Sequence, residues 1–96
     1  EFDEQTRLIR AERGRLQAAL GRLPGVTVFP SDANFLLLRT PPGRATAWFE
    51  GLRERGVLVK NLHGAHALLN DCLRPTVGTA EENAALTTAL SELSMR

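Results

Sequence analysis

The sequence predicts one small domain of the α/β (α+β) class with the element order α-β-β-α-β-β-α. Apolar residues recur at helical spacing in three segments, and short apolar or β-branched runs lie between them. Glycine or proline marks most of the boundaries. The chain has 96 residues, the length of a single domain, and its 43% hydrophobic content is normal for a globular protein. We therefore interpret residues 1–96 as one folded unit.

The first element is predicted to be a helix over residues 3–22. Its apolar residues form one stripe at helical spacing. The stripe consists of Leu8, Ile9, Leu16, Ala19, Leu20 and Leu23. The arginines of the same segment could form an anion-binding surface. We interpret them as a solvated helix face, because no aromatic residue interleaves them and the formal net charge of the chain is only +1.

Two short strands are predicted next, over residues 26–29 and 35–39. Leu23, Pro24 and Gly25 end the first helix, since glycine permits the turn and proline cannot continue a helix. The first strand is rich in β-branched residues, and residues 30–34 are turn-forming. The second strand is a continuous apolar run, which is typical of a strand covered on both faces, so we expect it inside the sheet.

The second half of the chain predicts a helix, two strands and a final helix. Residues 44–55 place Trp48 on an apolar helical stripe, where it is expected in the core, and Gly56 stands where a C-terminal cap belongs. Strands are predicted over residues 57–60 and 72–77, with a loop over residues 61–71. Thr79 and Glu82 then form a capping box at the start of the last helix.

These elements predict a mostly antiparallel sheet of three to four strands with the helices packed on one side. Strand 35–39, helix 44–55 and strand 57–60 form a β-α-β crossover, and strand 72–77 can lie between its two strands and antiparallel to both. Pro75 argues against a central position for this last strand, because proline donates no ladder hydrogen bond. We therefore expect a bulge or a missing bond at Pro75.

Lys60 and Arg74 are the candidate binding residues. Each directly follows a short apolar run of the predicted sheet, so two cations on neighbouring strands could face one anion. A guanidinium held by a strand can offer two parallel donors to a carboxylate or a phosphate. The alternative interpretation is an ordinary edge-strand arginine with a solvated head.

Other chemistry is sparse, and we predict neither a catalytic residue nor a metal site. His63 and His66 lie in a loop with Asp71 downstream, which is too few ligands for a metal. Cys72 is the only cysteine and is expected in the core, and a single cysteine fits a reducing, cytoplasmic compartment. The near-neutral charge gives no reason to expect nucleic acid or a membrane as partner, and we find no apolar run of membrane-span length and no signal peptide.

Three stretches of the sequence resemble the C-terminal small domain of histidinol-phosphate aminotransferases. They are residues 30–37 (Pro-Ser-Asp-Ala-Asn-Phe-Leu-Leu), residues 56–61 (Gly-Val-Leu-Val-Lys-Asn), and residues 72–79 (Cys-Leu-Arg-Pro-Thr-Val-Gly-Thr) with residues 81–83 (Glu-Glu-Asn). The resemblance is collinear and covers nearly the whole chain from the first helix to the last. Its specific pieces are Ala-Asn-Phe-Leu-Leu and Cys-Leu-Arg-x-Thr-Val-Gly-Thr. Pro75 departs from the family, which usually has an aliphatic or β-branched residue there.

The resemblance implies an enzyme of the class I/II, fold-type-I aminotransferases. In that family a large domain holds pyridoxal phosphate through a Schiff-base lysine, and the small domain closes over the substrate. Arg74 matches the arginine that binds the substrate's anionic end, a phosphate for histidinol phosphate and a carboxylate for glutamate. Lys60 matches a basic residue, often arginine, that helps to bind the same anion. The implied reaction is histidinol-phosphate:2-oxoglutarate transamination in histidine biosynthesis, by a parent enzyme that is a homodimer.

The lysine count adds a deduction of its own. Lys60 is the only lysine among the 96 residues, and it falls at the anion-binding position. The cofactor lysine is therefore expected outside this chain, in the large domain that the chain lacks. We expect these residues to be a fragment that binds no cofactor and is inactive alone.

Three alternatives remain open. The chain could be a stand-alone α/β module that binds an anionic metabolite, or the small domain of a related aminotransferase for aromatic or other amino acids. A split β-α-β domain that binds RNA is a third possibility. The near-neutral charge and the expected lack of exposed aromatic residues on the sheet weigh against RNA.

Overall fold

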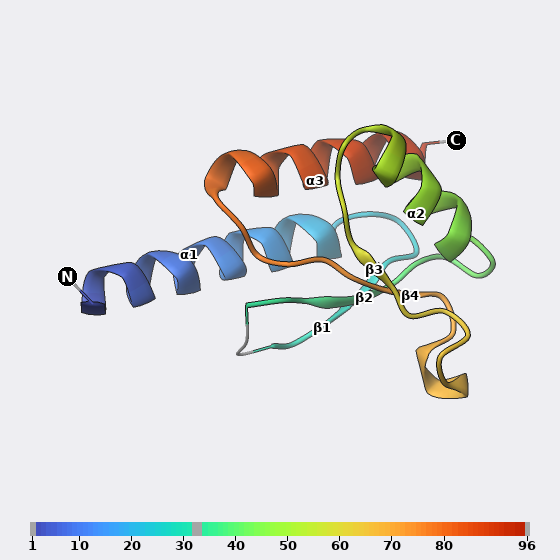
Figure 1. Ribbon diagram of the computed structural model, residues 1–96, viewed down its shortest axis with the longest axis horizontal. Coiled ribbons are helices and arrows are strands. Elements are labelled where there is room, and N and C mark those ends of the chain that lie inside the picture. Colours follow the sequence, from blue (N-terminus) through green and yellow to red (C-terminus); the bar gives the residue numbers. More distant parts are fainter. Residues whose placement is uncertain (1, 32–33, 96) are drawn as a thin grey trace.

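The computed structural model describes residues 2–31 and 34–95, and its element order agrees with the sequence prediction (Figure 1). Part of the predicted turn, residues 32–33, lies outside the described residues. The elements are α1 (Phe2–Gly21), β1 (Thr27–Phe29), β2 (Leu37–Arg39), α2 (Ala45–Glu54), β3 (Lys60–Asn61), the short 3-10 helix η1 (Ala67–Leu69), β4 (Cys72–Arg74) and α3 (Ala80–Ser94).

The four strands form one sheet in the order β1-β2-β4-β3. β4 pairs antiparallel with both β2 and β3, so β2 and β3 run parallel to each other with β4 between them. Helix α2 connects these two parallel strands. The predicted β-α-β crossover with an inserted antiparallel strand is therefore confirmed, and the continuous apolar run of β2 does lie inside the sheet.

The three helices pack on one side of the sheet, as predicted (Figure 1). The core lies between the two layers and combines leucines of all three helices with Leu36, Leu38 and Leu73 of the sheet. Trp48 of α2 is 1% exposed and is a core residue, as its position on the apolar stripe predicted. Among the described residues the opposite face of the sheet carries no α-helix, and only the short η1 lies on that side (Figure 1). The expectation that strand 35–39 is covered on both faces is therefore wrong, and Leu37 and Arg39 are only half-buried.

The start of α1 departs from the predicted buried stripe. Leu8 and Ile9 are 54% and 48% exposed, whereas Leu16 and Leu20 of the same helix are buried. Figure 1 shows the reason, since the first turns of α1 extend beyond the sheet and the other helices. Helical spacing identifies the apolar side of α1, but the length of the neighbouring elements decides how much of that side is covered.

The strand predicted over residues 57–60 is also shorter than expected. β3 begins at Lys60, and residues 57–59 have no ladder partner among the described residues. In the β3–β4 register the residue opposite Val59 is Pro75, and this is a non-hydrogen-bonded pair, because Pro75 directs its backbone carbonyl toward Leu36 on the other side. Beyond this point the two segments diverge around a pocket of about 390 Å³ that they line together with α3.

Pro75 interrupts the ladder on the β2 side of β4, which confirms the expected missing bond. Leu36 donates its N–H to the Pro75 carbonyl at 3.0 Å, but Pro75 can return no hydrogen bond. β4 consequently ends at Arg74 rather than at residue 77. Pairing resumes one residue later, at an isolated antiparallel bridge between Phe35 and Thr76. The sheet thus keeps its register across the proline.

The start of α3 is held by the predicted capping box and by a buried asparagine. The Thr79 hydroxyl accepts the Glu82 N–H, and the Glu82 carboxylate accepts the Thr79 N–H. Asn83 is 5% exposed and bonds both the N–H and the carbonyl of Gly78. Its amide nitrogen also donates to Glu12 of α1 at 3.1 Å. Asn83 therefore connects α1, α3 and the segment after β4.

No helix in the described part of the chain is long and apolar enough to cross a bilayer.

Glu12 makes folding stability depend on acidity. Hydrogen bonds from Arg15 and then from Asn83 hold the pKa of its carboxyl below the ordinary value of 4.5. A depressed folded-state pKa adds stability above 4.5, and this stability is lost as the pH falls through the folded-state value. We expect Glu12→Gln to flatten the decline of the urea midpoint between pH 6 and 3. Glu54→Gln, which removes an exposed carboxylate from α2, is the matched control, and an unchanged slope in Glu12→Gln would contradict the prediction.

Candidate anion-binding site

Lys60 and Arg74 lie directly opposite each other on β3 and β4. Directly paired residues of an antiparallel ladder project from the same face of the sheet. Leu73, the neighbour of Arg74 along β4, belongs to the core on the helix side. Since successive side chains alternate between faces, Lys60 and Arg74 both lie on the face without helices. The structure thus places the two predicted cations together.

The side chain of Arg74 has an unusual environment. Its guanidinium carbon lies 4.8 Å from the centre of the Phe35 ring. Its Nε is buried and has no hydrogen-bond partner among the described residues. Arg74 also takes part in no ion pair there. A buried guanidinium donor without an acceptor is costly. The same burial keeps a ligand away from Nε, so an anion would be bound by the terminal nitrogens of the guanidinium.

Lys60 is exposed and likewise forms no ion pair with a described residue. Like charges directly opposite each other on a ladder destabilise the sheet. The Lys60–Arg74 pair therefore concentrates positive charge that no described carboxylate neutralises. A bound anion would attract both side chains and so offset their mutual repulsion. This geometry can hold a phosphate or a carboxylate between a fork of donors and an ammonium group.

Arg39 is a third cation on the same face, and it is not among the predicted site residues. It is paired with Cys72 on β4, two residues before Arg74. Unlike Arg74, it has polar partners, because it donates to the carbonyls of Asn70 at 3.1 Å and Leu68 at 2.6 Å. Arg39 also directly follows an apolar run, so the rule that selected Lys60 and Arg74 would have selected it from the sequence.

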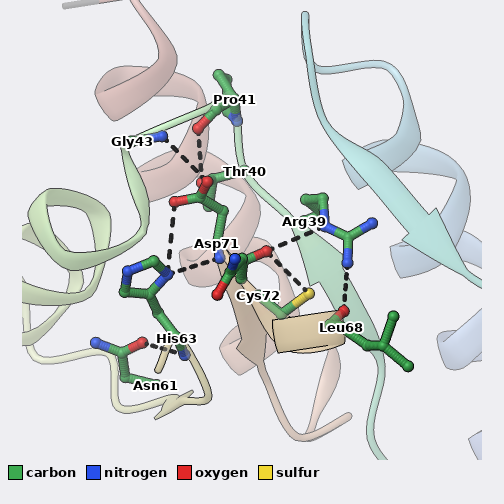
Figure 2. Close-up of polar contacts among 10 residues, drawn as sticks. Arg39, Thr40, Pro41, Gly43, Asn61, His63, Leu68, Asp71 and Cys72 are labelled. Atoms are coloured by element: carbon green, nitrogen blue, oxygen red, sulfur yellow. Dashed lines mark hydrogen bonds and ion pairs between the residues drawn. The ribbon is translucent and has the colours of Figure 1, made fainter. Parts of the chain in front are cut away.

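Arg39 contacts the loop over residues 61–71, and polar side chains of this loop form hydrogen bonds that hold its backbone in place (Figure 2). The His63 Nδ1 accepts the Asp71 N–H at 2.8 Å, and the Asp71 carboxylate accepts the Gly43 N–H at 3.1 Å. The His66 Nδ1 accepts the Leu68 N–H at the start of η1. Both imidazoles thus serve the loop backbone. The described residues contain no group of three or more His, Cys, Asp and Glu side chains that could hold a metal.

Two further sequence expectations concern the open face. Cys72 is completely buried and its thiol lies 3.7 Å from the Asn70 carbonyl, as expected of a structural cysteine. The expectation that the sheet exposes no aromatic residue is wrong, since Phe35 is 40% exposed. The apolar run over residues 35–38 is typical of a strand covered on both faces, but the helices cover only one side of it.

Comparison with known proteins gives a consistent result. No family model matches the chain. The chain is 61% identical over 89 residues to histidinol-phosphate aminotransferase 2 of Nitrosococcus oceani, an alignment that covers 93% of this chain and 25% of that protein. It therefore spans about a quarter of the length of the curated relative.

Solved structures agree in fold. The histidinol-phosphate aminotransferase of Clostridium acetobutylicum superposes with a TM-score of 0.87 at 20% identity, over 97% of this chain and 28% of that one. The L-threonine-O-3-phosphate decarboxylase of Porphyromonas gingivalis superposes with a TM-score of 0.83 at 27% identity, over 94% of this chain and 28% of that one. The chain is thus similar in sequence, over nearly its whole length, to about a quarter of a histidinol-phosphate aminotransferase, and it shares the fold of the corresponding part of the solved structures.

Proposed function

We propose that residues 1–96 are the C-terminal small domain of a pyridoxal-phosphate-dependent aminotransferase that converts histidinol phosphate with 2-oxoglutarate as the amino acceptor. In this proposal Arg74 and Lys60 bind the anionic end of the substrate. The observation that carries it is the direct pairing of these two cations on one face of the sheet, without an anionic partner among the described residues. The 61% identity to a histidinol-phosphate aminotransferase supports the choice of reaction.

The chemistry of the relatives' named substrates fits such a site. Histidinol phosphate and threonine-O-3-phosphate each combine an amine with a phosphate monoester. A phosphate offers several acceptor oxygens, which the guanidinium fork of Arg74 and the ammonium group of Lys60 can share. A transaminase must also bind glutamate and 2-oxoglutarate in turn, and their distal carboxylate can use the same anchor. Fixing that end places the reacting amine in a defined position, which lowers the entropy cost of the reaction.

The residues of this chain do not form a pyridoxal phosphate site. A Schiff base requires a lysine, and the only lysine is Lys60, which faces Arg74 on the open side of the sheet. We therefore propose that the cofactor is held by a large domain in another part of the protein, and that residues 1–96 alone are inactive. We also propose that the whole protein is a cytoplasmic homodimer, as the family resemblance implies.

One experiment separates this proposal from a stand-alone binding module. We expect pyridoxal phosphate added to the isolated 96 residues to give no stable internal-aldimine absorbance. The full-length protein encoded by the gene is expected to carry the cofactor and to transaminate histidinol phosphate. Weak binding of phosphate esters by the isolated chain is also expected, since half of the site is missing.

Three outcomes would overturn the proposal. A stoichiometric, active adduct at Lys60 would show that this chain holds the cofactor itself. A start codon immediately before Glu1 would favour a stand-alone module for anionic metabolites. A full-length enzyme that releases CO₂ from threonine-O-3-phosphate, but does not transaminate histidinol phosphate, would assign the activity to the decarboxylases that share the fold.

A further inference from the structure

We infer that Phe35 is a positioning residue of the anion site, because its ring holds the guanidinium of Arg74 in the orientation that receives the substrate anion. This inference rests on the proposed function. It assigns a role to a residue that contacts Arg74 but that is not itself a donor to the anion.

The backbone fixes Phe35 beside Arg74 independently of the ring. Phe35 forms an isolated antiparallel bridge with Thr76. Two hydrogen bonds flank this bridge, from Leu36 N–H to the Pro75 carbonyl at 3.0 Å and from Val77 N–H to the Asn34 carbonyl at 2.6 Å. Neither bond involves a side chain, so a substitution at Phe35 leaves the attachment of the strand intact.

The same register directs the ring toward Arg74. Phe35 and Thr76 are direct partners, and Arg74 precedes Thr76 by two residues on the same face. Phe35 and Arg74 are thus diagonal neighbours, a separation that aromatic and long side chains span. The result is the observed 4.8 Å between the guanidinium carbon and the ring centre.

No polar group among the described residues competes with the ring for Arg74. The comparison with Arg39 is informative, because both arginines lie on the same face and over a phenylalanine. Arg39 lies 5.3 Å from the Phe29 ring, but two loop carbonyls also hold it. Among the described residues Arg74 has only the ring as a partner, and its buried Nε has no acceptor there. Phe35 is therefore the main determinant of where the Arg74 guanidinium lies.

A ring is suited to this task because it contacts the flat side of a guanidinium. Cation–π attraction fixes that side, while the N–H groups in the guanidinium plane stay available for an anion. Without the ring, Arg74 would sample more rotamers and would lose more entropy on binding. The loss would weaken substrate binding, whereas the reacting groups would be unaffected once the substrate is bound.

The test uses the full-length enzyme with four variants. Phe35→Leu is expected to raise the KM for histidinol phosphate about three- to tenfold, with kcat nearly unchanged. Phe35→Tyr keeps the ring and is expected to restore the KM. Phe29→Leu removes the equivalent ring under Arg39 and is the matched control, with an unchanged KM. Arg74→Ala tests the proposed function itself.

The outcomes distinguish the two claims. If Arg74→Ala raises the KM but Phe35→Leu does not, or if Phe29→Leu acts equally, the inference about Phe35 is overturned and the proposed function stands. If Arg74→Ala has no effect, the proposed function fails and the inference fails with it.

The Arg74 Nε–H resonance in the NMR spectrum of the 96-residue chain gives a second measurement. Titration with inorganic phosphate should shift it less in Phe35→Leu than in the unaltered chain, and an equal shift would contradict the inference. Phe35 is 40% exposed, so its replacement should leave the fold intact.

Discussion

Replacement of Arg74 by alanine in the full-length enzyme is expected to lower kcat/KM for histidinol phosphate by about two to three orders of magnitude, which corresponds to roughly 3–4 kcal/mol of lost binding to a charged group. The reason is that alanine removes the fork of donors and leaves Lys60 to bind the phosphate alone. Both half-reactions should suffer, because glutamate uses the same anchor. Steady-state kinetics with each substrate varied in turn measure the effect.

Three further variants show whether the effect comes from the guanidinium itself. Arg74→Lys keeps the charge but loses the two parallel donors, so we expect a partial loss of kcat/KM. Lys60→Gln is expected to lose less than Arg74→Ala, because Lys60 is exposed and its charge is more strongly screened. Arg10→Ala, which removes an exposed cation from α1, controls for the change in net charge. Equal losses in Arg74→Ala and Arg10→Ala would contradict a specific anion site.

Replacement of Trp48 by alanine is expected to cost about 3–5 kcal/mol of folding free energy, the range for removing a large aromatic side chain from a core. Trp48 is 1% exposed and packs within the cluster that joins the three helices to the sheet. Small domains have only about 5–15 kcal/mol of total stability, so this variant should be largely unfolded under mild conditions. Urea unfolding followed by circular dichroism measures the loss, since the variant has no tryptophan fluorescence.

A second substitution at Trp48 identifies the origin of the loss. The indole Nε1 is buried without a hydrogen-bond partner among the described residues, so Trp48 contributes through packing rather than through a hydrogen bond. We therefore expect Trp48→Phe to lose less stability than Trp48→Ala. Thr46→Ala, at an exposed position of α2, should change stability little. If Trp48→Phe lost as much stability as Trp48→Ala, the loss would not depend on the volume of the side chain that is removed. That result would contradict a contribution through packing.

Much of the fold was predictable because its signals are local. The capping box at Thr79 and Glu82 and the positive φ of Gly56 after α2 each depend on a few neighbouring residues. The burial of Trp48 follows from the spacing of the apolar residues in its own helix. Even the order of β2, β4 and β3 followed, because a β-α-β crossover leaves one natural place for a later antiparallel strand.

The errors occurred where distant parts of the chain decide the outcome. Leu8 lies on the apolar side of its helix, but nothing in the helix itself says that the sheet ends before reaching it. Residues 57–59 have the composition of a strand, but the neighbouring segment diverges from them after Arg74, so they have no ladder partner among the described residues. Burial and strand pairing each depend on two segments of the chain, whereas a local sequence pattern describes only one of the two segments.

The same division applies to the anion site. The sequence by itself determined which cations follow the apolar runs, and these include Lys60 and Arg74 but also Arg39. Only the tertiary structure decided that these two are direct partners on one face, that Arg39 is held by loop carbonyls, and that Phe35 lies against Arg74. The physical reason is the antiparallel register, since a shift of one residue would move Arg74 to the helix side of the sheet and bury its charge in the core.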